Sequence, residues 1–396
     1  MRTTRKALLG FHLAVALLAP NAIAGGVRIV DPLLGSTSYP TPQAAIDAAP
    51  DGAILLIAAG SYPGFTITGK SISLFAVPGA TVDIQRAVFV SNLSSSQTVV
   101  LSGLYITLDN YDDYLPPVTV TNCLGSVRVE SSSLRAYDYD IGWCPGSGWF
   151  LNPGAPGALV SGSTRVVFRT CALTGGHGEG LDSGSDCCLC GTAPGGAGLK
   201  VAGGDSIVAL YDSMLTGGTG GGGECCEGRG GDGLKLDVGT AFASGCTFRG
   251  GAGGDSFQAH GLCGGPGGDG VAISGTLPIA LIDCASVGGP PGSPHVSCLV
   301  HSYPYRGGTI YGIRGPAAHA TFPATVISDS RPMSIAFDGW KGDVVTLLQG
   351  AQAPPVTAFG PRGPLLVGGD LITRTTLGQA QQNGVQIGRA SCRERV

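Results

Sequence analysis

The sequence predicts a parallel β-helix, an all-β solenoid in which short strands stack coil upon coil. Three observations predict it. A strand phrase recurs along the middle of the chain, each copy ends in a Gly-Gly pair, and a second, glycine-led phrase (the answering phrase) follows each of the first three copies. Self-similarity with a period of a few tens of residues indicates stacked supersecondary units. The strand phrase occupies residues 165–176, 206–218, 240–251 and 278–289, and the answering phrase occupies residues 195–201, 230–236 and 267–273.

Aligned copies of the strand phrase predict one inward-facing column of side chains. The four copies step by 42, 33 and 38 residues, and a variable step with a constant strand pattern places the insertions in turns. The unit is too short for a helix and two strands, so each coil pairs with the next at about 4.8 Å. Members of the column are small or apolar, as an inward rung requires. They are Leu104, Ser132, Cys171, Ser213, Cys246 and Cys284.

The N-terminal part of the chain predicts a cap for the first coil. Residues 42–49 form a short amphipathic helical run, and residues 53–60 form a buried strand. A helix at this end would cover the first coil, whose open edge would otherwise invite aggregation.

Residues 41–49, 59–64 and 72–79, with the later coils, resemble the pectin-lyase-like superfamily of right-handed parallel β-helix proteins. The resemblance spans roughly residues 27–320. It implies a right-handed parallel β-helix. Together with the helical run at residues 42–49 and the insertions that leave each coil at the same point, this predicts an N-terminal capping helix and glycine-rich loops on one edge. That superfamily holds polysaccharide lyases, glycoside hydrolases, esterases and adhesins, so the resemblance implies no single activity.

The N-terminal end of the chain indicates export, and the C-terminal end indicates a tail that does not belong to the natural protein. Residues 1–24 have the charged start, apolar stretch and small-residue cleavage site of a secretory signal peptide, which predicts a secreted or cell-surface protein. Residues 25–330 are the expected β-helix domain, and residues 331–386 are an expected short C-terminal β-rich module, truncated in this sequence. Residues 387–396 resemble a translated sequencing adapter, which implies that the natural chain continues past Gln386.

Composition limits the partners that the mature chain can bind. Of 23 Lys and Arg and 27 Asp and Glu, six basic residues and one acidic residue lie in the expected signal and tail, which leaves a net charge of about −9. This charge disfavours nucleic acid as a partner. After the signal no segment is apolar and long enough to insert into a membrane.

Glycine and cysteine lie mostly in the insertions. The chain has 68 Gly and 26 Pro, and the strand pattern indicates that glycine is organised at coil corners, while the longest runs, such as 217–223, are candidates for mobile loops. Without Cys392 the cysteine count is even, which in an exported chain predicts disulfides, with column cysteines as small apolar groups. The disulfide candidates in the loops are Cys187, Cys188, Cys190, Cys225, Cys226 and Cys263.

Metal binding is the alternative use of these insertions. His177 or His260 could join the cysteines at 187–190, but adjacent cysteines rarely ligate one ion and no Cys-x-x-Cys repeats, so no such site is expected. Windows 250–258 and 264–272 fit the calcium-binding nonapeptide of β-rolls, yet they stand 14 residues apart with a different segment between them. We therefore expect no cofactor, with calcium at these windows as the alternative.

The first two insertions, residues 109–114 and 137–143, combine aromatic rings with carboxylates. An aromatic face stacks on the apolar face of a sugar, and carboxylates bond to its hydroxyls. Because insertions leave each coil at the same point, they should lie together along one edge, which predicts a polysaccharide-binding site. Its candidate residues are Asp109, Tyr111, Asp112, Asp113, Tyr114, Tyr137, Asp138, Tyr139, Asp140 and Trp143.

Other functions stay open at this edge. Paired carboxylates could hydrolyse a glycosidic bond, or could hold calcium for elimination from an acidic sugar. The catalytic candidates are Asp112, Asp138 and Arg135, of which Arg135 is the base nearest to the tyrosine-aspartate insertions, although it matches no lyase motif. A solvated acidic loop with packed tyrosines, in a structural or adhesive surface protein, is the third interpretation.

Overall fold

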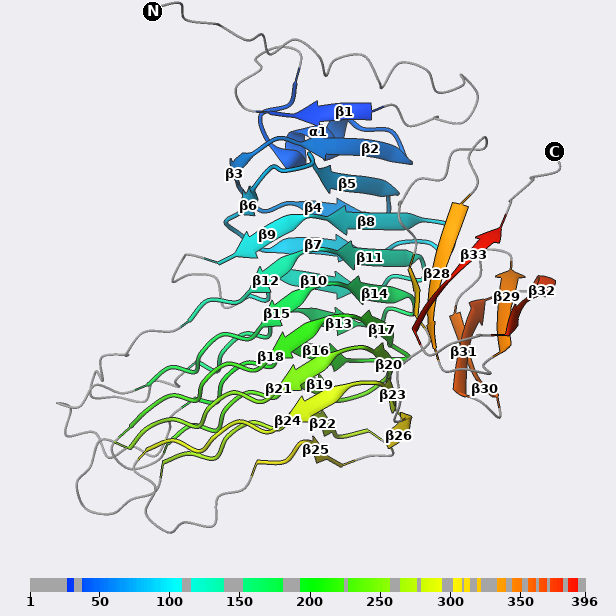
Figure 1. The fold of residues 1–396 in the computed structure, drawn as a ribbon. Coiled ribbons are helices and arrows are strands. Elements are labelled where there is room, and N and C mark those ends of the chain that lie inside the picture. The colour runs from blue at the N-terminus through cyan, green and yellow to red at the C-terminus, as the bar shows by residue number, and fades with distance from the viewer. Residues whose placement is uncertain are drawn as a thin grey trace, which may run out of the picture.

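The computed structural model describes residues 27–31, 38–108, 115–138, 152–180, 193–223, 227–256, 264–275, 279–293 and 302–307, and beyond them the backbone of the strands between residues 310 and 390. Its main body is a right-handed parallel β-helix built from three parallel sheets, A, B and C, which run along the solenoid (Figure 1). Each coil passes through a strand of sheet B, then of sheet C, then of sheet A, so strands three apart in sequence are neighbours.

The strands of each sheet follow in stacking order. Sheet A contains β1 (Val27–Val30), β2 (Ala53–Ile57), β5 (Ile72–Ala76), β8 (Thr98–Ser102), β11 (Ser126–Glu130), β14 (Val166–Arg169), β17 (Ile207–Tyr211), β20 (Thr240–Ser244), β23 (Ile279–Ile282) and β26 (Ile310–Ile313). Sheet B contains β3 (Gly60–Tyr62), β6 (Val82–Ile84), β9 (Leu104–Thr107), β12 (Ser133–Arg135), β15 (Ala172–Thr174), β18 (Met214–Thr216), β21 (Thr247–Arg249) and β24 (Ala285–Val287). Sheet C contains β4 (Thr66–Thr68), β7 (Val88–Ser91), β10 (Val118–Thr121), β13 (Leu159–Ser161), β16 (Leu199–Ala202), β19 (Leu234–Leu236), β22 (Val271–Ile273) and β25 (Tyr305–Arg306).

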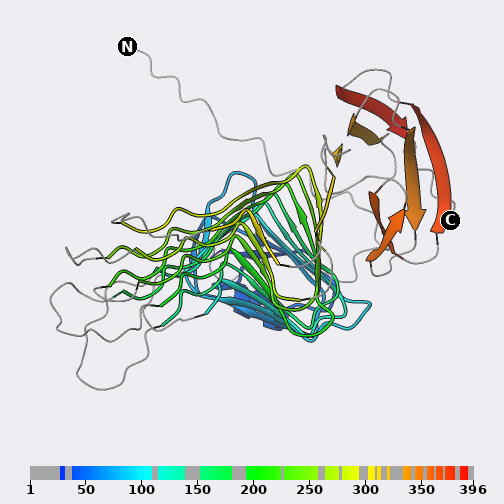
Figure 2. The ribbon, with the colours of Figure 1, turned by 90° about the horizontal axis from the view of Figure 1, so that it is seen from below.

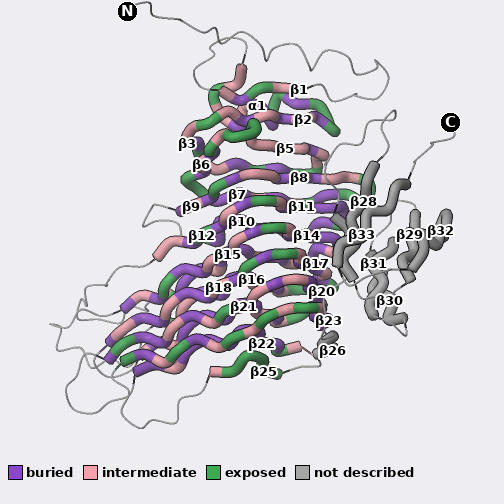
Figure 3. Tube along the Cα trace, in the orientation of Figure 1, coloured by how far each residue is buried: buried purple, intermediate pink, exposed green. Residues whose placement is uncertain are grey.

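Alternation along these strands separates the core from the surface (Figure 3). In β5, for example, Ile72 and Leu74 are buried while Ser73 between them faces outward. The inward residues of all three sheets join one continuous core that runs along the solenoid. Burial of this apolar column is the main stabilising term for coils that have no other hydrophobic partner.

The expected inward column is confirmed. Its first five members are buried, and Cys284, the last, is partly exposed and packs against the core. Serines in the column hold the preceding coil: Leu104 N–H donates to Ser132 Oγ at 3.1 Å, and Cys171 N–H donates to Ser213 Oγ at 3.1 Å. Each member follows a one-residue turn from sheet A to sheet B, and these turns use the left-handed conformation. The turn residues are Gly103, Ser131, Thr170, Asp212, Gly245 and Asp283.

A short helix, α1 (Pro42–Ala48), lies beside β1 and β2 at the N-terminal end of the solenoid (Figure 1). Thr41 caps it by accepting a hydrogen bond from Ala44 N–H, and Pro42 occupies the first turn, where no N–H is required. Ala45 and Ile46 are buried in the solenoid core. The helix is present where the sequence predicts it, and its protective role at this end stays a prediction.

Antiparallel strands follow the solenoid. β28 pairs with both β27 and β33, β29 pairs with β32, and β30 pairs with β31. β33 continues past Gln386 into the segment that resembles an adapter. The domain limits expected from the sequence stay predictions. The strands are β27 (His319–Thr321), β28 (Met333–Gly339), β29 (Val344–Gly350), β30 (Pro355–Gly360), β31 (Gly363–Gly368), β32 (Leu371–Gln379) and β33 (Gly384–Ala390).

Glycine-rich segments form two layers that project from one edge of the solenoid (Figure 2). Outgoing segments 175–180, 217–223, 250–256 and 288–293 follow strands of sheet B, and returning segments 152–157, 193–198, 227–233 and 264–270 precede strands of sheet C. Neighbours within the outgoing layer bond in parallel at every third residue, as Gly217 and Gly220 N–H donate to Arg249 and Ala252 O, each at 2.9 Å. This period is typical of polyproline II helices.

The two layers are bonded to each other in antiparallel fashion. Gly218 N–H donates to Gly196 O at 2.8 Å, and Gly221 N–H donates to Ala193 O at 2.9 Å. Backbone bonds therefore hold segments that have almost no apolar side chains. The run 217–223 belongs to this bonded array, which corrects its interpretation as a mobile loop.

Alkaline pH is expected to destabilise the solenoid through one buried thiol, Cys171, and one partly buried phenol, Tyr211. Burial, with a smaller contribution from Glu130, raises the pKa of Cys171 from 9.0 to about 11, and burial together with Cys246 raises that of Tyr211 from 10.0 to about 12. Both groups are neutral when protonated. Their stabilising contribution is therefore complete below pH 9.0 for the thiol and 10.0 for the phenol, and is lost as pH rises through about 11 and 12.

Each shift corresponds to a loss on the order of 3 kcal/mol in the free energy of unfolding. Urea unfolding across this alkaline range measures it. Cys171→Ser is the matched variant, because serine already occupies the neighbouring column position Ser213, and it should lose less stability on alkalinisation than the wild type. Equal alkaline losses in both proteins would contradict the assignment to Cys171.

Candidate functional site

Only part of the expected aromatic and acidic edge lies within the described residues. Arg135, the last residue of β12, is described, as are Tyr137 and Asp138, which follow this strand. The other candidates lie outside the described residues and stay predictions. They are Asp109, Tyr111, Asp112, Asp113, Tyr114, Tyr139, Asp140 and Trp143.

Asp138 is the centre of a charged cluster on this edge. Arg135 Nη2 donates to Asp138 Oδ2 at 2.5 Å, and the Nε2 atom of His177 lies 3.5 Å from Asp138 Oδ1. His177 N–H also donates to this oxygen at 3.3 Å. The hydrogen bond and charge of Asp138 raise the pKa of Arg135, against a small opposing effect of burial. The cluster thus brings a planar cation, a carboxylate and an imidazole together on two adjacent coils.

His177 reaches Asp138 because of the glycine layers. It is the third residue of the triplet that begins with Gly175 and Gly176, which are both buried while His177 is exposed. A Cβ on Gly176 would stand 2.0 Å from Tyr137 O, so only glycine lets the outgoing segment approach the chain that carries Asp138. From the sequence, His177 is only a candidate metal ligand beside the loop cysteines, whereas the structure places it against Asp138.

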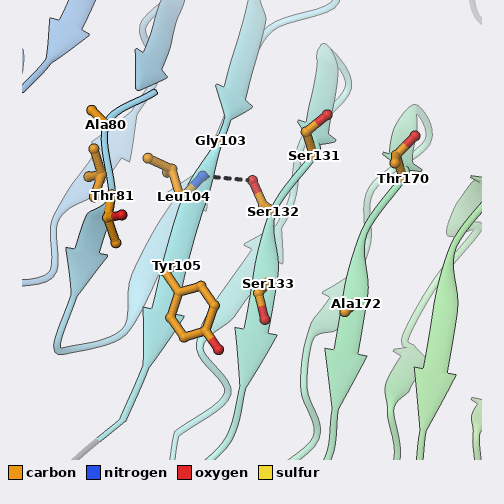
Figure 4. Close-up of a pocket in the computed structure, with 11 residues that line it drawn as sticks. Ala80, Thr81, Gly103, Leu104, Tyr105, Ser131, Ser132, Ser133, Thr170 and Ala172 are labelled. Atoms are coloured by element: carbon orange, nitrogen blue, oxygen red, sulfur yellow. Dashed lines mark hydrogen bonds between the residues drawn. The ribbon is translucent and has the colours of Figure 1, made fainter. Parts of the chain in front are cut away.

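A groove of about 460 Å³ lies beside this cluster, on the outer side of the turn from sheet A to sheet B. Tyr105 of β9 and Ser133 of β12 are register partners there, and Figure 4 shows them side by side with the Ser131 and Thr170 hydroxyls on the next turns. Tyr105 is 53% exposed. Small residues also line the groove: Ala80, Gly103 and Ala172.

The groove and the charged cluster form one surface. Ser133 and Arg135 belong to the same strand and point to the same side, two residues apart. Tyr105 also contributes, as the smallest cause, to the raised pKa of Arg135. We call Tyr105, Ser131, Ser133, Arg135, Asp138, Thr170 and His177 the sheet B surface.

Tyr105 was missed in the sequence analysis, although a signal for it existed. Leu104 was assigned to the inward column, and strand alternation then turns Tyr105 outward. An outward tyrosine among serines, threonines and alanines on neighbouring rungs is a candidate binding residue. The neighbours themselves could be found only once the register of β9, β12 and β15 was known.

The insertion candidates for disulfides and calcium have different outcomes. Cys187, Cys188, Cys190, Cys225, Cys226 and Cys263 lie outside the described residues, so their pairing stays a prediction. Within the described residues no group of His, Cys, Asp or Glu side chains could hold a metal ion. In the first of the two calcium windows, Asp255 accepts a hydrogen bond from Ser293 N–H at 2.7 Å. In the second, Asp269 accepts a hydrogen bond from Arg229 at 2.6 Å.

The strand order and parallel register of sheets A, B and C decide the fold. The fold is a right-handed parallel β-helix. The fold that the resemblance implies is thereby confirmed. Within the described residues no helix is long and apolar enough to span a membrane.

Comparisons with solved structures include pectin-active enzymes. A pectin methylesterase in complex with a hexasaccharide aligns with 13% identity and a TM-score of 0.37, over 65% of this chain and 78% of that one. Pectin methylesterase PemA from Erwinia chrysanthemi aligns with 12% identity and a TM-score of 0.36, over 65% and 78%. Pectate lyase Pel9A aligns with 13% identity and a TM-score of 0.28, over 68% and 78%. No protein-family model matches the chain, and no curated protein matches it.

Proposed function

We propose that this protein is exported, is secreted or held at the cell surface, and binds a polysaccharide on the sheet B surface. One observation carries the proposal: a half-exposed tyrosine stands in an open groove lined by hydroxyls, beside an Arg–Asp–His cluster. The sequence supports export through the signal-like residues 1–24.

The chemistry of the groove suits a sugar chain. The Tyr105 ring supplies an apolar face of the kind that packs on a pyranose ring, and its neighbours Ser131, Ser133 and Thr170 supply donors and acceptors for hydroxyls. Arg135 adds a planar donor that suits ring oxygens and carboxylates. A polymer can follow the groove because it crosses adjacent coils instead of closing over a small molecule.

The contacts that the charged groups already make favour recognition of a sugar chain over its cleavage. Asp138 is the carboxylate of the charged cluster, and both of its oxygens contact Arg135 or His177. Asp83 of β6, the register partner of Tyr105, accepts hydrogen bonds from Ser61 and Gln85. Glycoside hydrolysis uses two carboxyl groups, and Asp112, the second candidate, lies outside the described residues. A hydrolase or lyase is therefore the competing function, and the same experiment distinguishes it.

Tyr105→Ala is expected to weaken polysaccharide binding by about 1–3 kcal/mol, the scale of losing one aromatic anchor. Affinity electrophoresis against a panel of neutral and acidic polysaccharides finds the ligand, and titration calorimetry then measures the change. Tyr305→Ala is the matched control, because Tyr305 is also exposed but lies on sheet C at the C-terminal end of the solenoid.

Two outcomes would redirect the proposal. Release of reducing ends or unsaturated sugars, abolished by Asp138→Asn with binding retained, would establish an enzyme. No binding to any polysaccharide, or equal losses in Tyr105→Ala and Tyr305→Ala, would reject the sheet B surface as a sugar site.

A further inference from the structure

Two thiols occupy neighbouring rungs at the C-terminal end of the inward column. Cys246 precedes β21 and Cys284 precedes β24, and these strands pair in parallel with Thr247 opposite Ala285. Ala285 N–H donates to Cys246 O at 2.9 Å, which fixes the two cysteines in register. Rungs of a parallel sheet lie about 4.8 Å apart, within the Cα separation of about 4.4–6.8 Å that disulfides require.

Their side chains have matching orientations. Cys246 Sγ donates to Ser244 O at 3.3 Å, and Cys284 Sγ donates to Ile282 O at 3.2 Å. Each thiol thus bonds to the carbonyl two residues before it, so both sulfur atoms occupy the same corner of successive coils. The parallel register therefore places the two thiols next to each other on adjacent rungs.

The other described cysteines provide a contrast. Cys171 has Ser213 on the next rung, bonded at 3.1 Å, and Cys123 has Ser163 on the next rung, also at 3.1 Å. A serine hydroxyl cannot form a disulfide. Of the four cysteines that the structure describes, Cys246 and Cys284 are therefore the pair in which one thiol faces another on the adjacent rung.

We propose that Cys246 and Cys284 form a disulfide across adjacent coils when the protein meets a small-molecule disulfide such as oxidised glutathione. The Cys284 thiolate attacks the oxidant and releases one glutathione thiol, which leaves a mixed disulfide on Cys284. Cys246 loses its proton and displaces the second glutathione thiol. Two protein thiols are oxidised, and one glutathione disulfide is reduced to two thiols.

The positions of the two sulfurs suit this order of events. Cys284 is partly exposed and Cys246 is 1% exposed, so an oxidant reaches Cys284 first. The adjacent Cys246 thiol lowers the pKa of Cys284, which favours its thiolate. Cys246 then needs no large movement to reach the mixed disulfide.

The bond would fasten the base of the outgoing glycine layer. Segments 250–256 and 288–293 leave sheet B directly after β21 and β24, the two strands that follow these cysteines. Gly250 N–H donates to Val287 O and Gly253 N–H to Pro290 O, each at 2.9 Å. A covalent link a few residues earlier holds both segments in that register.

Peptide mapping of the full chain tests the proposal. The protein is incubated with dithiothreitol or with oxidised glutathione, denatured, alkylated, and digested without reduction. After oxidation we expect one peptide pair that joins Cys246 to Cys284, about 2 Da lighter than the sum of the two reduced peptides. Cys123 and Cys171 should be alkylated in both samples, and the oxidised protein should melt a few degrees higher.

Cys284→Ser and Cys171→Ser are the matched variants. The first should show a smaller melting shift between oxidised and reduced samples than the wild type, and the second should keep the wild-type shift, because any contribution of loop disulfides is common to all three proteins. Complete alkylation of Cys246 and Cys284 after oxidation, or a bond from either cysteine to any other, would overturn the proposal, and this readout on the wild-type protein does not depend on the folding of a variant.

Discussion

Gly218→Ala is expected to cost about 3 kcal/mol or more of stability and to disrupt the glycine layers. A Cβ at this position would stand 1.9 Å from Gly176 O, a backbone atom that cannot rotate away. Overpacking by a methyl group costs about 1–3 kcal/mol where side chains can shift, so a rigid carbonyl places this change at or above the upper end. A comparable requirement explains why only glycine fits at the axis of collagen.

The loss of stability should extend to neighbouring segments, because the backbone of Gly218 is hydrogen-bonded to two of them. Its N–H donates to Gly196 O at 2.8 Å, and its own carbonyl accepts from Gly231 N–H at 2.7 Å. Gly218 is not among the glycines with positive φ, so close approach and not backbone freedom requires glycine here.

Urea unfolding measures the cost, and hydrogen exchange of the Gly218 and Gly231 amides shows where the structure opens. Thr219→Ala is the matched control, because Thr219 is the adjacent, partly exposed residue of the same segment, and it should change stability by no more than about 0.5 kcal/mol. Wild-type stability and exchange in Gly218→Ala would show that the layers do not pack as described.

Arg229→Met is expected to destabilise the protein by about 3–5 kcal/mol, the cost of removing one partner from a buried ion pair. Arg229 Nη2 donates to Asp232 Oδ1 at 2.7 Å and to Asp269 Oδ2 at 2.6 Å, and these carboxylates are only 4% and 1% exposed. Without the guanidinium, the nearest cation to Asp269 is Arg306, at 3.8 Å. Two buried carboxylates would then repel each other with little compensation.

The network joins successive returning segments, which explains the size of the effect. Asp269 N–H donates to Asp232 Oδ1 at 2.9 Å, and Tyr303 N–H donates to Asp269 Oδ1 at 2.7 Å. Each carboxylate therefore accepts a backbone hydrogen bond from the following coil as well as bonding to the arginine.

Denaturant unfolding of Arg229→Met is compared with Arg128→Met, an exposed arginine on β11 with no ion pair among the described residues. The control should stay within about 0.5 kcal/mol of the wild type. Adding Asp232→Asn and Asp269→Asn to Arg229→Met should recover part of the loss, because the unpaired charges disappear. Equal effects of the two arginine variants would mean that the network does not stabilise the fold.

The predictable part of the site was the part that depends on strand alternation. Arg135, Tyr137 and Asp138 were found because they follow a column strand, and the column itself was confirmed rung by rung. Tyr105 could have been found in the same way. The contact between Asp138 and His177 could not, because 39 residues and a glycine segment separate them in sequence.

The sequence by itself determined the solenoid. Alternating apolar residues, a small column residue after each sheet A strand and insertions at one corner repeat locally, and local repetition is enough to specify one coil and its stacking partner. The tertiary structure alone decided what the insertions become. Gly176, Gly218 and Gly251 look like flexible loop residues in sequence, yet a Cβ on any of them would collide with a carbonyl of a neighbouring segment. Contacts between backbones distant in sequence leave no side-chain pattern, so only the assembled coils show that these glycines form ordered layers and carry His177 to Asp138.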